Sequence, residues 1–291
     1  MLAFGAADIR AARAQDVITP APEVVYFANV TAAPFKWIGR LTIPNPAKGQ
    51  GWLSVCTAQF ITPNVILTAG HCLGDLSEYP TGPFGDPSQG QFQLQYNSGS
   101  VTQTYKIVCG LSSPLYSLPS NYTSLPAAQQ QAAQAAAHPH DFAMLLVNGT
   151  SSTGVMPYVL DWKGKYSFVW RIGYPADVIG GDLMIYTPGI VFTADTIPLP
   201  SPYNLSNLVV QWGPMTDATE GMSGGAWAAP ITDNKGNITS FVMVAVTSFS
   251  VDLKTDNTTS EAPAYPGAAW AAYLTAAEFN PLLQKVQNSC K

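Results

Sequence analysis

Short runs of β-forming residues, separated by turn-forming residues, are the feature that most constrains how this chain of 291 residues can fold. Apolar β-type runs occupy residues 52–55, 58–61, 65–68, 91–96, 101–108, 142–147, 184–186, 208–212 and 241–249. Turn formers separate several of these runs, at residues 62–64, 97–99, 148–149 and 234–236. Because many short strands joined by such turns are typical of sandwiches and barrels, the sequence predicts an all-β fold.

Two segments depart from this pattern. Residues 126–137 are rich in Ala and Gln, which indicates either a surface helix or a loose insertion. The tail, residues 268–288, carries large apolar residues at about helical spacing, which predicts a terminal helix, either continuous or broken at Pro281.

The polar stretch at residues 148–154 predicts a boundary between an N-terminal domain, residues 1–150, and a C-terminal domain, residues 151–291.

The composition excludes two classes of partner. Hydrophobic residues make up 47% of the chain and charged residues 11%, so a large core is expected under a surface of neutral polar groups. The formal net charge is −5, whereas nucleic-acid binding needs a basic surface. No apolar run approaches the roughly 20 residues of a membrane-spanning helix, so no membrane partner is expected.

Cysteines and sequons point to an oxidising compartment. The chain has four cysteines, an even number, which allows three disulfide pairings. No two of these cysteines have the Cys-x-x-Cys spacing that would suggest a zinc site. Residues 1–7 are apolar but too short for a full signal peptide, and are interpreted as a remnant or an added start. Six N-x-S/T sequons with few charges favour a secreted glycoprotein; they lie at Asn29, Asn121, Asn148, Asn204, Asn237 and Asn257.

His71 is the first candidate for chemistry. It lies at the end of a strand–turn–strand segment, residues 56–72. The simplest interpretation of a lone histidine there is a partly buried side chain at the end of a strand. The flanking pattern, residues 67–72, favours a functional role instead. A bond between Cys56 and Cys72 would join the two strands beside it and contribute on the order of 3 kcal/mol. Cys109 and Cys290 would then form a second pair or remain free.

Asp141 is the second candidate, because it stands at the entrance of an apolar strand. A carboxylate in that place can hold the Nδ1–H of a histidine and stabilise an imidazolium. The alternative is an aspartate that caps a turn. His138 and His140 lie nearby, but two histidines offer too few ligands to predict a metal site.

Ser223 is the candidate nucleophile. A small-residue turn presents it, with Gly221 before it and two glycines after it. The backbone N–H groups of Gly221 and Ser223 could form an oxyanion hole, in which each donor stabilises a transition state by roughly 3–4 kcal/mol. An ordinary Gly/Ser turn is the alternative.

Taken in chain order, these segments resemble one enzyme family. TAGHC at His71, DFAMLLV from Asp141 and EGMSGGAW at Ser223 resemble the motifs of the chymotrypsin/trypsin superfamily of serine endopeptidases. RIGYPAD, residues 171–177, resembles a segment of the bacterial glutamyl-endopeptidase branch. The resemblance covers about residues 35–250. It implies two six-stranded antiparallel β-barrels, with His71 and Asp141 on the first barrel, Ser223 on the second and the active site between them. The terminal helix expected from the apolar spacing would follow the second barrel.

The resemblance also implies a role for each residue. Ser223 would attack a peptide carbonyl, His71 would take its proton and Asp141 would orient His71. Residues 247–250 resemble the strand that runs beside a bound substrate, so Ser248 would hydrogen-bond Asp141 and Ser250 would contact the substrate backbone. The expected protein is a monomeric, secreted peptidase that acts on polypeptides and needs no cofactor or metal.

The chain departs from the trypsin-like pattern around Ser223. Met222 replaces the aspartate that pairs with a new N-terminal amine, which predicts activation without that ion pair. Asp217 stands where trypsin-like enzymes have the carboxylate at the pocket floor, and it either favours Arg or Lys at the cleaved bond or is a solvated loop residue. Thr247 replaces the histidine of glutamate-specific relatives, which excludes that route to glutamate specificity.

Two competing interpretations follow. An inactive, protease-like binding protein is favoured by Met222 and the insertions, but the retention of His71, Asp141, Ser223 and Gly221 argues against it. An esterase of the α/β-hydrolase type is disfavoured because its residues come in the order Ser, Asp, His.

Overall fold

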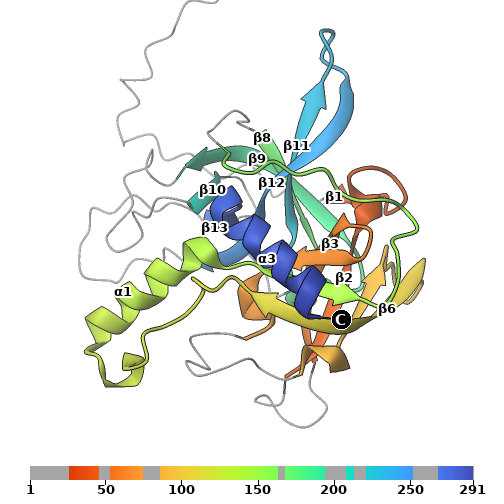
Figure 1. Cartoon of the computed structure of the whole chain (residues 1–291). Helices are drawn as coiled ribbons and strands as arrows, with labels where there is room; N and C mark the ends of the chain where they lie inside the picture. Colours follow the sequence, from red (N-terminus) through yellow and green to blue (C-terminus); the bar gives the residue numbers. More distant parts are fainter. Residues whose placement is uncertain are drawn as a thin grey trace, which may run out of the picture.

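The computed structural model describes residues 26–45, 53–74, 86–162, 168–193, 208–212, 221–251 and 268–290 (Figure 1). Two sets of antiparallel strands make up most of this part of the chain. The helix α3 (Ala276–Ser289) crosses in front of the strands in the view shown.

The first set of strands closes into a barrel of six. Its order is β2-β3-β4-β7-β6-β5, and every pairing is antiparallel. Buried aromatic side chains fill the interior, where the ring of Phe60 lies 5.3 Å from that of Phe92 and 5.1 Å from that of Tyr105. The strands are β2 (Ile38–Pro44), β3 (Leu53–Thr62), β4 (Val65–Thr68), β5 (Gln91–Leu94), β6 (Gln103–Ser112) and β7 (Ala143–Val147).

The second set also closes into a ring of six. Its strands run in the order β9-β10-β13-β12-β11-β8, and an antiparallel pairing of β8 with β9 completes the ring. The short β1 (Tyr26–Phe27) pairs with the first two residues of β9. The hairpin β11–β12 projects away from the body of the protein in Figure 1. The ring contains β8 (Phe168–Gly173), β9 (Ile185–Thr193), β10 (Leu208–Trp212), β11 (Ala226–Thr232), β12 (Ile238–Val251) and β13 (Ala268–Tyr273). The prediction of two six-stranded antiparallel barrels with a C-terminal helix is confirmed.

Several local predictions need correction. The runs at residues 52–55 and 58–61 were expected to form separate strands, but residues 53–55 and 58–61 lie in the single strand β3. The first six residues of the predicted tail helix form β13, which is hydrogen-bonded to β10 on one side and β12 on the other. Helix α3 begins only at Ala276 and continues through Pro281 without a break. Of the two alternatives for residues 126–137, the structure shows the helix, α1 (Ala127–Ala137).

The C-terminal helix packs on the first barrel, although its sequence follows the second. A disulfide joins Cys109 on β6 to Cys290, whose Cα atoms lie 5.7 Å apart. The ring of Phe279 on α3 lies 6.5 Å from that of Phe142 and 4.8 Å from that of Tyr158. Figure 1 accordingly shows the C-terminus beside β6. A domain division near residue 150 stays a prediction.

Polar and aromatic contacts also join the two barrels. Arg40 on β2 stacks its guanidinium on Tyr96, just after β5 of the same barrel, at 3.5 Å from the ring centre, and its Nη1 lies 3.5 Å from a carboxylate oxygen of Asp182, just before β9. The hydroxyl of Tyr174, just after β8, donates to the backbone oxygen of Tyr96 at 3.0 Å. These contacts fix the second barrel against the first on one side of the molecule.

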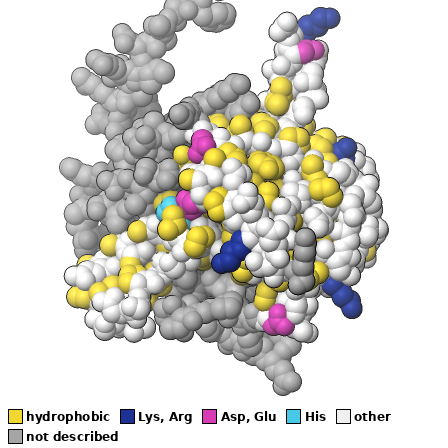
Figure 2. Space-filling model, viewed as in Figure 1, with side chains coloured by type: hydrophobic (Ala, Val, Ile, Leu, Met, Phe, Trp, Pro, Cys, Tyr) yellow, Lys and Arg dark blue, Asp and Glu magenta, His cyan; other side chains and the backbone are white. Residues whose placement is uncertain are grey.

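The surface matches the composition. On the face in Figure 2, charged side chains are scattered among neutral and apolar ones. Within the described ranges, the chain contains no helix that is both long enough and apolar enough to cross a membrane.

Candidate active site

His71 and Asp141 meet because of how two strands pair. His71 lies in a 3-10 helix, η3 (Gly70–Cys72), directly after β4, and Asp141 lies just before β7. Strands β4 and β7 are antiparallel, and Thr68 is paired with Ala143. The end of one strand therefore lies beside the start of the other.

The carboxylate of Asp141 binds His71 at two points. Its Oδ2 lies 2.7 Å from His71 Nδ1, and its Oδ1 accepts the backbone N–H of His71 at 2.8 Å. Asp141 is 1% exposed, whereas the side chain of His71 is 22% exposed. The arrangement fixes the ring orientation and leaves the histidine accessible.

Asp141 keeps its charge despite burial. Burial raises the pKa of the Asp141 carboxyl, but the charge of His71 and hydrogen bonds from His71 and Ser248 lower it more. The net result is a pKa below the usual 3.8. Ser248 Oγ donates to Asp141 Oδ2, which is the contact that the sequence predicted for it. An ionised carboxylate therefore faces the imidazole at neutral pH.

The segment that carries Ser223 is held to the first barrel by one buried residue, Thr57 on β3. The backbone N–H of Thr57 donates to the carbonyl oxygen of Ser223 at 2.8 Å, and its Oγ1 donates to that of Gly221 at 2.7 Å. Thr57 Oγ1 also accepts the N–H of Tyr174 at 3.0 Å. Because Thr57 follows Cys56, which is bonded to Cys72, the segment lies next to η3: Cys72 Sγ is 3.9 Å from the carbonyl oxygen of Ser223.

Two glycines in this segment have backbone conformations that L-residues rarely adopt. The φ angle is +90° at Gly221 and +78° at Gly224. A Cβ atom at Gly224 would collide with Thr68 Oγ1 and the carbonyl oxygen of Thr57. The glycines therefore let the serine-bearing turn approach the first barrel.

Residues 221–225 also match the Gly-x-Ser-x-Gly spacing of the nucleophile elbow. In α/β-hydrolases that elbow joins a strand to a helix. Here the segment leads into β11 of an antiparallel barrel, so the match is one of spacing only.

Strand β12 carries the residues expected beside a substrate. Gly224 N donates to Thr247 O, and Thr247 N donates to Gly225 O, both at 2.8 Å. The Thr247 hydroxyl is buried and accepts Trp227 Nε1–H at 3.0 Å. Ser250 is paired with Ala269 of β13. The expected role of Ser250 stays a prediction, and Asp217 lies outside the described residues.

Met222, at the position of the trypsin-like aspartate, is 1% exposed. It packs against Gly173 of β8, where an added Cβ atom would lie 3.0 Å from Met222 Sδ. The position is therefore filled by an apolar side chain.

Sequence reasoning did not find two of these features. Thr57 carries no local signal, because its partners Tyr174 and Gly221 lie 117 and 164 positions away. The contact between His140 and Glu278 joins residues 138 positions apart. One local signal was available for Glu278: the Thr-x-x-Glu spacing from Thr275 is typical of a helix start.

No protein-family model matches the sequence, and no curated protein matches it. Solved structures do match its fold. The protease Anisep from Arthrobacter nicotinovorans has a TM-score of 0.58 and 17% identity, over 92% of this chain and 99% of that one. A Glu endopeptidase has a TM-score of 0.57 and 18% identity, over 93% and 100%. Human heparin binding protein has a TM-score of 0.56 and 15% identity, over 91% and 96%.

At these identities the likeness describes the backbone rather than the chemistry. It extends over nearly the whole of each chain, and it agrees with the two closed rings of strands and the terminal helix. The chain has the fold of the trypsin-like serine proteases.

Proposed function

We propose that this protein is a serine endopeptidase in which Ser223, His71 and Asp141 form a catalytic triad. The observation that carries the proposal is the double contact of the buried, ionised Asp141 carboxylate with the ring and backbone of His71. This contact orients the His71 ring and would stabilise its imidazolium, which is what a general base beside a serine nucleophile requires. The seating of the Ser223 segment on Thr57, beside η3, supports the same proposal.

The mechanism follows from the roles of these groups. Ser223 Oγ attacks the peptide carbonyl carbon while His71 takes its proton, and Asp141 stabilises the imidazolium that forms. The imidazolium then protonates the leaving amine, and an acyl-enzyme remains on Ser223. Water hydrolyses this ester with His71 again as the base. The N–H groups of Gly221 and Ser223 would stabilise the developing oxyanion.

The substrate is a polypeptide under this proposal, with its backbone along Ser250 of β12. Asp217 would favour Arg or Lys at the cleaved bond. Cleavage-site profiling on a peptide library with wild type and Asp217→Ser tests this, and an unchanged preference would remove Asp217 from the specificity pocket.

A secreted, glycosylated protein is also part of the proposal. Two disulfides support an oxidising compartment. Four of the six sequon asparagines fall in the described ranges, and all four are exposed. Enzymatic removal of N-glycans from the protein purified from culture medium should lower its mass; an unchanged mass would count against glycosylation.

The central experiment combines a fluorophosphonate probe with peptide hydrolysis. Wild type should be labelled at Ser223, and Ser223→Ala should lose both labelling and hydrolysis while its circular dichroism is unchanged. Ser240→Ala, on the projecting hairpin, is the matched control and should behave as wild type. Full hydrolysis by Ser223→Ala would end the proposal.

A protease-like binding protein without activity is the second candidate. The human heparin binding protein, which shares this fold, is named for binding rather than cleavage. The net charge of −5 disfavours a polyanion as the ligand of this chain. An oxidised, correctly folded sample that fails to react with the probe would favour this candidate.

A further inference from the structure

Glu278, near the start of α3, is bound by groups that precede Asp141 in the first barrel. Its two carboxylate oxygens each lie 2.9 Å from His140 Nδ1. Ser113, just after β6, donates its hydroxyl to the same carboxylate at 2.9 Å. The Glu278 side chain is only 13% exposed. A carboxylate from the C-terminal helix thus lies partly buried against the residue next to Asp141.

The contacts of this carboxylate differ from those of a helix cap. The spacing of Thr275 and Glu278 is that of a capping box, in which the glutamate turns back to the helix start. Here the Thr275 hydroxyl makes no cap bond to the helix backbone and instead donates to Glu278 at 3.2 Å. The glutamate is directed at His140 and Ser113, across to the first barrel.

The charge of Glu278 is retained in this position. Burial raises the pKa of the Glu278 carboxyl, but the hydrogen bond and charge of His140, with hydrogen bonds from Ser113 and Thr275, lower it more. The net direction is below the usual value of 4.5. At neutral pH the carboxylate is therefore ionised and able to hold its partners firmly.

Helix α3 contacts the residues on both sides of Asp141. Glu278 binds His140, and the neighbouring Phe279 packs its ring against Phe142. Ser113, the other partner of Glu278, also donates its backbone N–H to the Phe142 carbonyl at 2.9 Å. The turn that presents Asp141 is thus held from both ends by one helix.

We propose that Glu278 is a positioning residue, which acts through His140 to keep the Asp141 carboxylate aligned with His71. The proposal rests on the proposed function. Without this contact, the short 3-10 helix η6 (His138–His140), which also packs against β13 and α1, loses its tie to α3, and the carboxylate loses alignment with the imidazole. A displacement of about 1 Å in such a site costs on the order of a hundredfold in rate.

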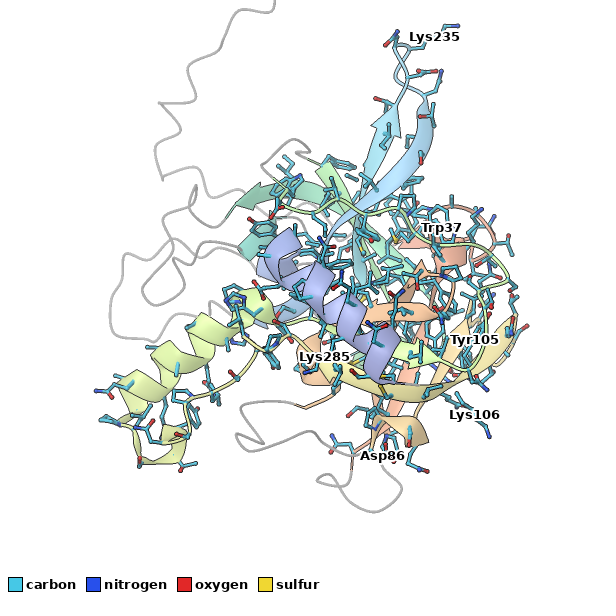
Figure 3. All side chains as sticks on the ribbon, in the orientation of Figure 1. Trp37, Asp86, Tyr105, Lys106, Lys235 and Lys285 are labelled. Carbon is cyan, nitrogen blue, oxygen red and sulfur yellow. A yellow bond between two sulfur atoms is a disulfide. The ribbon has the colours of Figure 1, made fainter. Side chains whose placement is uncertain are left out.

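The test compares Glu278→Ala and Glu278→Gln with Lys285→Ala, which changes an exposed residue on the same helix (Figure 3). Each variant is titrated with the fluorophosphonate, so that rates refer to competent sites. For Glu278→Ala, we expect kcat to fall by about ten- to a hundredfold, with KM within about twofold. Glu278→Gln keeps an acceptor for Ser113, so its kcat should lie between those of wild type and Glu278→Ala. The kcat of Lys285→Ala should match that of wild type.

The pH profile separates positioning from a loss of folded protein. A misaligned Asp141 stabilises the imidazolium less, so the acidic limb of kcat/KM should move to lower pH in Glu278→Ala, and further than in Glu278→Gln, which removes the same charge. Misfolding alone would reduce the titre and leave the profile in place. Unchanged kcat and an unchanged limb in a reactive enzyme would overturn the proposal.

A double-mutant cycle tests the route through His140. If Glu278 acts through this residue, adding His140→Ala to Glu278→Ala should cause little further loss. If the losses of kcat in the two single variants simply add in the double variant, Glu278 does not act through His140.

A spectroscopic measurement keeps this proposal separate from the proposed function. If wild type does not react with the probe, the proposed function fails, and the proton NMR signal of the N–H between His71 and Asp141 decides positioning instead. That signal should shift or broaden in Glu278→Ala and not in Lys285→Ala, and an unchanged signal would overturn the proposal. Should Glu278→Ala not fold, the same measurements on Glu278→Gln decide.

Discussion

At the scale of single residues, Thr57 has the most consequence for the site. Its hydroxyl donates to Gly221 O and accepts from Tyr174 N, and all three lie in a buried region. A buried polar group that loses its partner keeps its full desolvation cost. Replacing the Thr57 hydroxyl by a methyl group therefore affects both the serine-bearing turn at Gly221 and the start of the segment after β8 at Tyr174.

Thr57→Val should destabilise the protein by about 1–3 kcal/mol, because it keeps the side-chain shape and removes the hydroxyl. Urea unfolding measures the loss. Thr239→Val is the control, since that hydroxyl also donates to a carbonyl, of Ile231, but is exposed to water. Equal losses in the two variants would contradict the assignment.

The charge of Asp141 makes a second prediction at this scale. Its pKa is lower in the folded protein than the usual 3.8, so its contribution to stability is fully present above that pH and is lost as the pH falls through the folded value. Asp141→Asn lacks this dependence. Unfolding measured from pH 6 down to about pH 2 should therefore show the stability difference, wild type minus variant, decreasing in acid. A constant difference would mean that Asp141 is not held ionised.

At the scale of elements, the sequence predicted most strands and one of the two longer helices, α3, in outline. Alternating or continuous apolar runs with turn residues identified β4, β5 and β10 closely. The error at residues 268–273 has a clear cause. Short Ala-rich runs that are apolar on every position suit a buried strand or a helix equally, and only the pairing with β10 and β12 decides.

The candidate site was predictable to a similar degree. Motifs around His71, Asp141 and Ser223 are local, so the sequence identified them, and Ser248 followed from the resemblance. Thr57 and Glu278 act over more than a hundred positions of sequence, and a single sequence contains no local pattern for such contacts. These residues become visible only when the barrels and the terminal helix are in place.

Helix α3 provides a prediction at the element scale. Pro281 is exposed within the helix, and it cannot donate to the carbonyl of Ala277. Pro281→Ala should restore that bond and stabilise the protein by about 1–3 kcal/mol, seen as a higher thermal midpoint. Gln284→Ala, also exposed on α3, should change the midpoint little. A lower midpoint for Pro281→Ala would show that the ring is needed where it stands.

At the scale of the whole molecule, the two disulfides constrain very different lengths of chain. Cys56–Cys72 spans 16 positions and Cys109–Cys290 spans 181. In the chain-entropy account, the short loop contributes about 3 kcal/mol and the long loop about 5 kcal/mol. The long bridge should therefore matter more for global stability and the short one more for the local geometry beside His71.

Paired serine variants test this division. Replacing Cys109 and Cys290 together should lower the free energy of unfolding more than replacing Cys56 and Cys72 together, by roughly 2 kcal/mol. The second pair of changes should reduce the rate of probe labelling more. Unfolding in urea and labelling kinetics on the same samples give both quantities, and a reversed order in the unfolding measurement would contradict the prediction.

The bridge from β6 to the last helix also changes what a cut in the backbone would do. Every peptide bond between Cys109 and Cys290 lies inside a covalent loop, and this loop contains Asp141, Ser223 and the whole second barrel. A single nick anywhere within it leaves both fragments attached to one another. Such a protein would run as one band in a denaturing gel without reductant and as two bands with it, and it would keep His71, Asp141 and Ser223 on one connected molecule.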